Sequence, residues 1–287
     1  MSMRKLFPVG ATLETNTSEA VKVTTGQEAV QQATAEMNIL RSLSHLDADS
    51  CHIVNFNGQF LHKKNICLRF ELLDQSLHEY LCDRHFQGLP LSQVRTVLHQ
   101  LATALLHLQS AEIIHADLKP QNIMVVDRHV DPIEVKIIDF GLAQPTSETN
   151  SETYVQSLPY TAPEVLLDAP FNEAIDMWTL GLIAVELAGP IPDHILDRGA
   201  LTEDHPDQPH FVDLIKRMLH LDADQRIKPM EVLNHPFFTA IHRGSHPETS
   251  HGVMSVNTED LQASEQPPCS LAAASTISEQ ASVTSFS

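Results

Sequence analysis

The chain has 287 residues, of which 42% are hydrophobic, which suits a globular protein with one large domain or two smaller ones. Acidic residues outnumber Lys and Arg by 37 to 18, and the formal charge of −19 argues against direct binding to a nucleic-acid backbone, which needs a basic surface. No run approaches the roughly 20 apolar residues of a membrane span, and the first residues lack the apolar segment of a signal peptide. We therefore expect an intracellular protein without a membrane anchor.

The first part of the chain has the pattern of a small α/β unit. Apolar residues predict a strand over residues 20–23 and further strands around residues 53–60 and 66–71. Between them, apolar residues at three- and four-residue spacing predict a helix with one apolar face, and Thr25 and Glu28 have the spacing of a capping box at its start.

The second part of the chain has a mainly helical pattern. Apolar residues recur at helical period from residue 91 to residue 112, so this helix is expected to be largely buried. Two short strands joined by a polar turn follow, over residues 123–126 and 135–138. Three further helices are predicted over residues 174–187, 210–219 and 229–234. Residues 243–287 are poor in large apolar side chains and rich in Ser, Thr, Ala, Gln and Glu, which predicts a disordered tail.

Residues 113–122 (IIHADLKPQN) set an acid, an amine and an amide at fixed offsets after an apolar strand. Phosphoryl transfer needs metal ions held by oxygen ligands, a cation on the phosphates and a carboxylate oriented on the incoming hydroxyl. Asp117 and Asn122 form the pattern D-x-x-x-x-N, and Asp139 begins an Asp-Phe-Gly triplet after the two predicted strands. A hairpin of those strands would bring Asp139 beside Asn122, where their oxygens suit Mg²⁺.

Further motifs follow in the order found in protein kinases. An Ala-Pro-Glu triplet ending at Glu164 closes a stretch of activation-loop length, and Asp176 opens the next helix in an Asp-x-Trp-x-x-Gly pattern. Arg226 is placed to pair with Glu164. Each triplet alone is weak, because solvated loop acids match it by chance, but their joint occurrence in this order predicts a protein kinase fold.

Four segments carry a resemblance to one kinase family, namely residues 115–120 (HADLKP), 154–157 (YVQS), 171–178 (FNEAIDMW) and 233–237 (LNHPF). From residue 20 to about residue 241 the chain resembles the catalytic domain of the homeodomain-interacting protein kinases, which are related to the dual-specificity Tyr-regulated kinases. Ala116 stands where most protein kinases have Arg, and Ala is usual in that family. The resemblance implies that no Arg reads a phosphate on the activation loop, so the switch based on an Arg–phosphate pair is absent.

The resemblance implies an α+β, bilobal protein-kinase-like fold. A small β-rich N-lobe with one helix is expected over about residues 1–72, and a larger, mainly helical C-lobe over about residues 76–242. ATP and Mg²⁺ are the implied cofactors, Ser/Thr hydroxyls of protein substrates the implied acceptors, and transcription regulators the implied partners. Residence in the nucleus is implied by the resemblance alone, and the cytoplasm is the alternative.

The catalytic roles fall on residues that match the family's motifs. Asp117 is the expected base for the substrate hydroxyl, and Lys119 is expected to neutralise the γ-phosphate. Asn122 and Asp139 are expected to hold Mg²⁺. Ser157 is expected to tie Asp117 to Lys119.

Nucleotide binding is expected on the N-lobe side. Lys22 matches the strand lysine that contacts the α and β phosphates, and Glu36 matches its ion-pair partner on the following helix. An exposed strand lysine and an unrelated helix glutamate are the alternative. For adenine the resemblance implies two residues that sandwich the ring, one at the back of the pocket and two that offer backbone hydrogen bonds: Ala20, Met124, Phe70, Glu71 and Leu73, in that order. Plain core is the alternative for these hydrophobic positions.

Three departures from the family pattern bear on activity. Only Gly10 precedes Lys22, so the first strand and most of the glycine-rich loop over the phosphates are expected to be missing or replaced by residues 9–14. Thr161 stands where the family has Arg before Ala-Pro-Glu, which puts a preference for Pro after the target residue in doubt. Residues 189–211 form a shorter segment than the family has there.

Tyr154 matches the tyrosine that this family modifies on itself, which predicts autophosphorylation. A buried aromatic side chain that packs the loop is the alternative.

Two functions stay open at the level of the sequence. The first is an ATP- and Mg²⁺-dependent Ser/Thr protein kinase that works by positioning and electrostatic stabilisation. The second is a pseudokinase or interaction and scaffold module with weak or no turnover. Intact Asp117, Lys119, Asn122 and Asp139 favour the first, and the short N-terminus favours the second. We expect the enzyme, because the metal and base residues are most directly tied to the chemistry.

Overall fold

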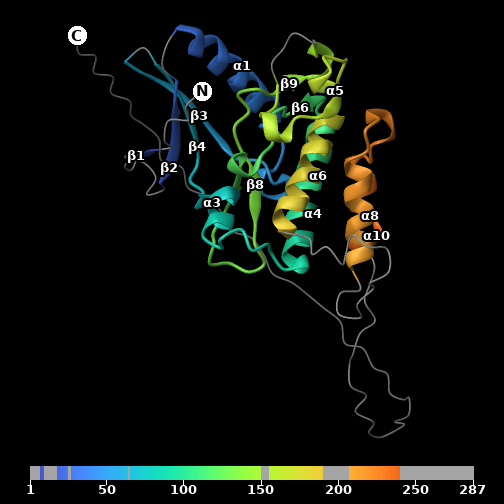
Figure 1. The fold of residues 1–287 in the computed structure, drawn as a ribbon. Helices are drawn as coiled ribbons and strands as arrows, with labels where there is room; N and C mark the ends of the chain where they lie inside the picture. Colours follow the sequence, from blue (N-terminus) through green and yellow to red (C-terminus); the bar gives the residue numbers. More distant parts are fainter. Residues whose placement is uncertain are drawn as a thin grey trace, which may run out of the picture. The chain divides into compact units, whose positions relative to one another are not determined.

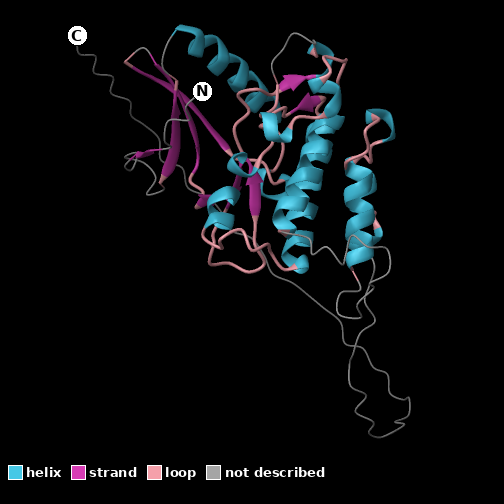
Figure 2. Cartoon of the chain, viewed as in Figure 1, coloured by secondary structure: helices cyan, strands magenta, loops and turns pink. Residues whose placement is uncertain are grey.

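The computed structural model of the protein describes residues 7–9, 18–24, 27–63, 65–149, 155–189 and 207–239. Within the unit Met1–Ile241, a sheet and one long helix form the N-terminal part, and helices dominate the C-terminal part (Figure 1, Figure 2). The fold is therefore α+β, as the sequence predicted. The predicted tail, residues 243–287, lies outside the described residues.

The N-terminal sheet is antiparallel. Its strands, in order across the sheet, are β1 (Phe7–Val9), β2 (Glu19–Val23), β4 (Asn65–Glu71) and β3 (Phe56–His62). Helix α1 (Gln27–Leu43) packs against β4 and buries Ala33 and Leu40 of its apolar face. Thr25 lies outside the described residues, so the capping box stays a prediction.

Strand β1 corrects one expectation. The sequence predicted that the first strand is missing or replaced by residues 9–14, yet a three-residue strand, β1, precedes most of that range and pairs with β2, with Phe7 opposite Val21 and Val9 opposite Glu19. Three residues with a central Pro give no alternating pattern, and Pro is tolerated in a sheet mainly at its edge, which is where β1 lies. Residues 10–17 lie outside the described residues, so the missing glycine-rich loop stays a prediction.

Two long helices form the centre of the C-terminal part, α4 (Leu91–Ser110) and α6 (Ala174–Ala188), which lie side by side (Figure 1). The other helices are α2 (Ala48–Cys51), α3 (Leu77–Cys82), α5 (Pro163–Leu166), α8 (Gln208–Met218), α9 (Pro229–Leu233) and α10 (Pro236–Thr239). Helix α4 ends two residues before the predicted end, because Glu112 turns into the left-handed region with a φ of 55°. Gly181 lets α6 approach α8, since a Cβ there would lie 2.9 Å from that of Met218. No helix among the described residues is both long and apolar enough to cross a lipid bilayer.

Short strands and turns connect these helices. Strands β5 (Gln75–Ser76), β7 (Ile123–Val125) and β8 (Val135–Ile137) form one small sheet, and β6 (Ile113–Ile114) pairs with β9 (Gln144–Pro145). Single 3₁₀ turns lie at η1 (Pro120–Asn122), η2 (Thr146–Glu148), η3 (Leu158–Tyr160) and η4 (Ala223–Gln225).

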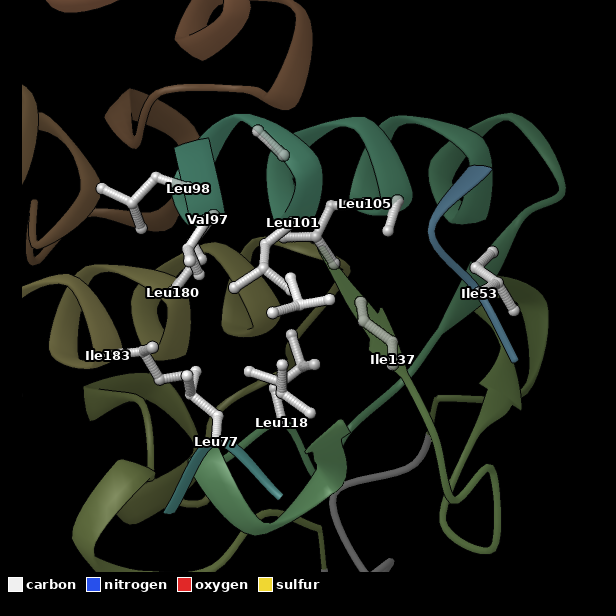
Figure 3. Packing of buried hydrophobic residues seen from close by; sticks show 14 of the residues in the cluster. Ile53, Leu77, Val97, Leu98, Leu101, Leu105, Leu118, Ile137, Leu180 and Ile183 are labelled. Carbon is white, nitrogen blue, oxygen red and sulfur yellow. The ribbon is translucent and has the colours of Figure 1, made fainter. Parts of the chain in front are cut away.

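The main apolar core joins α4, α6 and β8. Leu101 of α4, Leu180 of α6 and Ile137 of β8 are at most 1% exposed and belong to one cluster (Figure 3). Each fully buried side chain of this kind stabilises the fold by about 1.5–3 kcal/mol. Ile53, which follows α2, forms a parallel bridge with Ile137, so the N-terminal part is anchored directly to the strand that leads into the Asp-Phe-Gly triplet.

Candidate active site

The hairpin of β7 and β8 brings Asn122 and Asp139 to the same end. The strands are antiparallel with Ile123 opposite Ile137, and the amide of Ile138 donates a 2.9 Å hydrogen bond to the carbonyl of Asn122. Asn122 immediately precedes β7, and Asp139 follows β8 by two residues. The two polar side chains are thus neighbours because of the strand register.

The carboxylate of Asp117 is held by three side chains. Lys119 Nζ donates to Oδ2 at 2.6 Å, Ser157 Oγ donates to Oδ1 at 2.8 Å, and Asn122 Nδ2 donates to Oδ2 at 3.0 Å. Lys119 Nζ also donates to Ser157 Oγ at 2.8 Å. These bonds fix the orientation of the acid, whose side chain is 11% exposed and so still reachable from solvent.

A buried carboxylate holds the backbone of the catalytic loop. Asp176, in the first turn of α6, accepts hydrogen bonds from the amides of His115 at 2.7 Å and Ala116 at 3.0 Å. Ala116 has a φ of 61°, a left-handed conformation that costs a non-glycine residue about 1–3 kcal/mol. Burial raises the pKa of Asp176, and the two amides offset this only in part. The strained loop is therefore held by α6.

His115 links the catalytic loop to the Asp-Phe-Gly triplet. Its Nδ1 accepts a 3.3 Å hydrogen bond from the amide of Asp117, so Nε2 carries the proton and donates to the carbonyl of Ile138 at 2.9 Å. The ring also meets Phe140 edge-on, with the centroids 5.0 Å apart. The positions of Asp117 and Asp139 are thus coupled through one imidazole.

An ion-pair triad joins β2, α1 and the Asp-Phe-Gly triplet. Lys22 Nζ lies 2.7 Å from Glu36 Oε1 and 2.6 Å from Asp139 Oδ1. Burial lowers the pKa of Lys22, but the two carboxylates outweigh it and leave this pKa above its ordinary value. Burial likewise acts to raise the pKa of Asp139, and Lys22 more than reverses this. The ammonium group therefore stays charged between two acids.

The five residues expected around adenine lie on β2, on and just after β4, and on β7. Ala20 of β2 stands opposite Phe70 of β4, and Glu71 and Leu73 follow directly. Ala20, Phe70, Leu73 and Met124 of β7 belong to the main apolar cluster. The fold brings these residues together, and their roles toward adenine stay a proposal.

The donor set near Asp139 fits Mg²⁺. Asn122 Oδ1 is buried and has no hydrogen-bond partner among the described residues. Of the two carboxylate oxygens of Asp139, it is Oδ1 that accepts hydrogen bonds from Lys22 and from the amide of Gly141. The described residues contain no cluster of three or more His, Cys, Asp or Glu side chains that would hold a metal unaided. An amide oxygen of Asn122 and a carboxylate of Asp139 are hard oxygen donors, and Mg²⁺ takes one or two such protein oxygens together with substrate phosphates.

The ion pair expected between Glu164 and Arg226 is present. Arg226 Nη1 and Nη2 donate to the two carboxylate oxygens of Glu164 at 2.7 and 3.0 Å, and Nη1 also donates to the carbonyl of Ala174 at 2.8 Å. The guanidinium lies 5.2 Å from the ring centroid of Trp178. This pair anchors the end of the activation segment, residues 139–164, to α6.

Two residues near the site were missed by sequence reasoning. Gln156 is buried and makes hydrogen bonds to α6 and to the activation segment through its side chain. Lys136 of β8 is buried and bonded to Glu71 and Asp49. A lysine inside the apolar stretch around β8 was the only visible signal for the second. Tyr154 lies outside the described residues, so its modification stays a prediction.

The chain is similar to known protein kinases over most of its length. The protein kinase domain matches residues 10–238. Homeodomain-interacting protein kinase 2 of Mesocricetus auratus is 34% identical over 320 residues, which cover 83% of this chain and 27% of the relative. Homeodomain-interacting protein kinase 1 of Caenorhabditis elegans is 46% identical over 157 residues, covering 55% of this chain and 19% of the relative. Homeodomain-interacting protein kinase 4 of Homo sapiens is 44% identical over 154 residues, covering 53% of this chain and 25% of the relative. The chain thus spans about a quarter or less of the length of these relatives.

Proposed function

Because the chain belongs to the protein kinase family, and within it to the homeodomain-interacting protein kinases, we propose that it is a protein serine/threonine kinase. In the proposed reaction, ATP donates its γ-phosphate to the hydroxyl group of a protein side chain. The observation that carries the proposal is the fixed carboxylate of Asp117, held by Lys119, Ser157 and Asn122 within 3.0 Å.

Asp117 has the position of a base for the incoming hydroxyl. The hydroxyl oxygen forms a bond to the γ-phosphorus, the bond to the β,γ-bridging oxygen breaks, and the hydroxyl proton passes to Asp117. Lys119, bonded to both Asp117 and Ser157, offers a cation to the phosphate in transfer. Because these groups are held before substrate binds, little reorganisation is needed during the reaction.

The triad of Lys22, Glu36 and Asp139 supports the proposed nucleotide site. Lys22 offers its charge to the α and β phosphates, and Glu36 fixes its direction at 2.7 Å. Asn122 Oδ1 and the Asp139 carboxylate are the proposed ligands of Mg²⁺, which neutralises charge on the β and γ phosphates when bound. Ala20, Phe70, Leu73 and Met124, with the backbone of Glu71, are proposed to hold adenine.

An interaction module without turnover is the competing function. No observation of the described residues favours it, because the proposed base, Asp117, lies beside the proposed cation, Lys119, and the proposed metal ligand Asn122. That alternative depends on the predicted loss of the glycine-rich loop, which falls on residues that the structure does not describe.

The test compares two measurements on purified wild type and three variants. Transfer from Mg-ATP to a basic peptide with one serine is expected for wild type and to fall about 10²-fold or more in Asp117→Asn. The nucleotide-induced shift in melting temperature is expected to persist in Asp117→Asn and to shrink in Lys22→Met, because Lys22, unlike Asp117, is proposed to contact the phosphates of bound ATP. Lys216→Met, on the exposed surface of α8, is the control for loss of a positive charge. Equal transfer by wild type and Asp117→Asn would exclude the enzyme.

The relatives' names state that they interact with homeodomain proteins. We extend this to the chain as a proposal for its partners, with residence in the nucleus. Both are tested by imaging a tagged chain in cells and by co-purification with transcription regulators. A uniformly cytoplasmic signal would contradict the nuclear assignment.

A further inference from the structure

Gln156 makes four hydrogen bonds that join three segments of the site. Its backbone amide donates to the carbonyl of Ala116 at 2.7 Å. Its side-chain amide donates to the carbonyl of Ile175 at 3.0 Å and to Thr179 Oγ1 at 2.9 Å, both in α6. Its side-chain oxygen accepts from the amide of Ala162 at 2.8 Å. One buried residue, through its backbone and its side chain, thus ties the catalytic loop, helix α6 and the residue before Pro163 together.

A second apolar cluster lies around these hydrogen bonds. It consists of Ile114, Ala116, Val155, Ala162, Phe171 and Ile175, all buried. The methyl group of Ala116 is completely buried in this cluster, at the position where most protein kinases have Arg. The space that an arginine would need is therefore taken by apolar side chains of the activation segment and of α6.

Ala116 and Gln156, which this backbone hydrogen bond joins, share an unfavourable backbone conformation. Ala116 has a φ of 61° and Gln156 a φ of 64°, both in the left-handed region that non-glycine residues avoid. Such conformations persist where the surroundings fix them, and they cluster at functional sites. Asp176 of α6 holds the backbone of Ala116, and the side chain of Gln156 is bonded to the carbonyl of Ile175 in the same helix. Helix α6 therefore supports the strained backbone of both residues that the 2.7 Å hydrogen bond from Gln156 to Ala116 joins.

We propose that Gln156 is a positioning residue that holds the activation segment against the catalytic loop in place of a phosphate and an arginine. It acts on Asp117 through the neighbouring Ala116 and on the Ser157 hydroxyl, 2.8 Å from Asp117, through the chain itself. This inference rests on the proposed kinase function. A phosphate on the activation segment is then unnecessary for turnover.

Gln156→Glu tests the proposal with little change in shape. The second carboxylate oxygen of the new glutamate would take the place of Gln156 Nε2 and face the carbonyl of Ile175 and the hydroxyl of Thr179. An ionised carboxylate cannot donate a hydrogen bond to either of them. We expect kcat at pH 8 to fall at least tenfold while the KM for ATP changes less than threefold, since the triad around Lys22 is untouched. The partners of the side-chain amide are Ile175, Thr179 and Ala162, none of them ionisable, so the new acid is the one group among these partners that lowering the pH protonates. The ratio of wild-type kcat to Gln156→Glu kcat is therefore expected to fall toward 1 as the pH is lowered from 8 to 6.

Two further variants cover the case in which Gln156→Glu does not fold. Thr179→Val removes one acceptor of the amide and is expected to lower kcat severalfold, and Thr179→Ser keeps the hydroxyl and should retain wild-type kcat. Gln59→Glu on the exposed surface of β3 is the control for the added charge. Wild-type kcat in both Gln156→Glu and Thr179→Val would overturn the proposal.

Two readouts separate this inference from the proposed function. Phosphatase-treated wild type, verified by mass spectrometry, is expected to keep at least half its kcat, and a tenfold loss would overturn the proposal. Amide hydrogen exchange over residues 115–117 and 155–162 is expected to speed up in Gln156→Glu even if no substrate is phosphorylated. Unchanged exchange there would show that Gln156 does not hold the segment, whatever the activity of the wild type.

Discussion

The ammonium group of Lys136 lies 2.9 Å from each carboxylate oxygen of Glu71. The same group donates to Asp49 at 2.6 Å, so β8, α2 and the end of β4 meet at one cation. The side chain of Lys136 is 2% exposed, whereas those of Glu71 and Asp49 are 24% and 81% exposed. Lys136 therefore fixes the side chain of Glu71, whose backbone is proposed to hold adenine.

Because Lys136 is more deeply buried than Glu71, we expect removal of Glu71 to destabilise the protein more than removal of Lys136. Glu71→Leu leaves a buried ammonium with an exposed partner and is expected to cost about 3 kcal/mol of unfolding free energy. Lys136→Met removes the buried charge, and the remaining carboxylates reach solvent, so about 1 kcal/mol is expected. Urea unfolding measures both, with Lys216→Met as the control. A larger loss in Lys136→Met than in Glu71→Leu would contradict this account.

The pair of Asp74 and Arg128 is expected to make stability fall in acid. The hydrogen bonds from Arg128, at 2.7 and 2.6 Å, lower the pKa of Asp74 to about 2. Since this pKa is lower in the folded than in the unfolded chain, the pair stabilises above about pH 4, and the contribution is lost as the pH falls toward 2. Because the Asp74 side chain is 24% exposed, we expect only about 1 kcal/mol.

Asp74→Asn measures that contribution. The difference in unfolding free energy between wild type and Asp74→Asn should be present at pH 6 and shrink between pH 4 and pH 2. Asp224→Asn, at an exposed position, controls for loss of one negative charge. A difference that is constant from pH 6 to pH 2 would show that Asp74 titrates normally.

The core of the site was predictable because its residues are close in sequence or fixed by strand register. Asp117, Lys119 and Asn122 span six positions, and a hairpin of the predicted strands implied that Asp139 would follow beside Asn122. The apolar period of residues 91–112 gave α4 to within two residues. Glu164 and Arg226 were paired only because the motif order resembled a known family.

Contacts that depend on tertiary packing were not predictable. Lys136 and Asp49 are 87 positions apart, and no local pattern relates them. Gln156 looks like an ordinary polar loop residue until α6 supplies its acceptors. Strand β1 has three residues and a proline, too little for periodicity to indicate a strand.

The ion pair of Glu164 and Arg226 is expected to be costly to break on one side only. The Arg226 side chain is fully buried and Glu164 is 10% exposed, so Glu164→Leu leaves an unpaired buried guanidinium. We expect a loss of about 3–5 kcal/mol in denaturant unfolding, and partial recovery when Arg226→Met is added. Additive losses in the double variant would mean that the two side chains are energetically independent.

Ala116→Arg should weaken the protein, although it creates the sequence that most protein kinases carry. The added guanidinium has no room among the apolar side chains of the second cluster, so a loss of about 3–5 kcal/mol is expected, together with a lower kcat. Ala35→Arg on the exposed side of α1 is the matched control in thermal unfolding. Wild-type stability and turnover in Ala116→Arg would mean that the cluster does not exclude an arginine.

The most direct test of the central claim is a single-turnover measurement of phosphate transfer from Mg-ATP by wild type, Asp117→Asn and the exposed control Asp224→Asn. If Asp117 is the base held by Lys119, Ser157 and Asn122, wild type and Asp224→Asn transfer phosphate at the same rate, and Asp117→Asn is slower by about 10²-fold or more. Equal rates in all three proteins, or no transfer in any, would contradict the assignment of this chain as an active kinase.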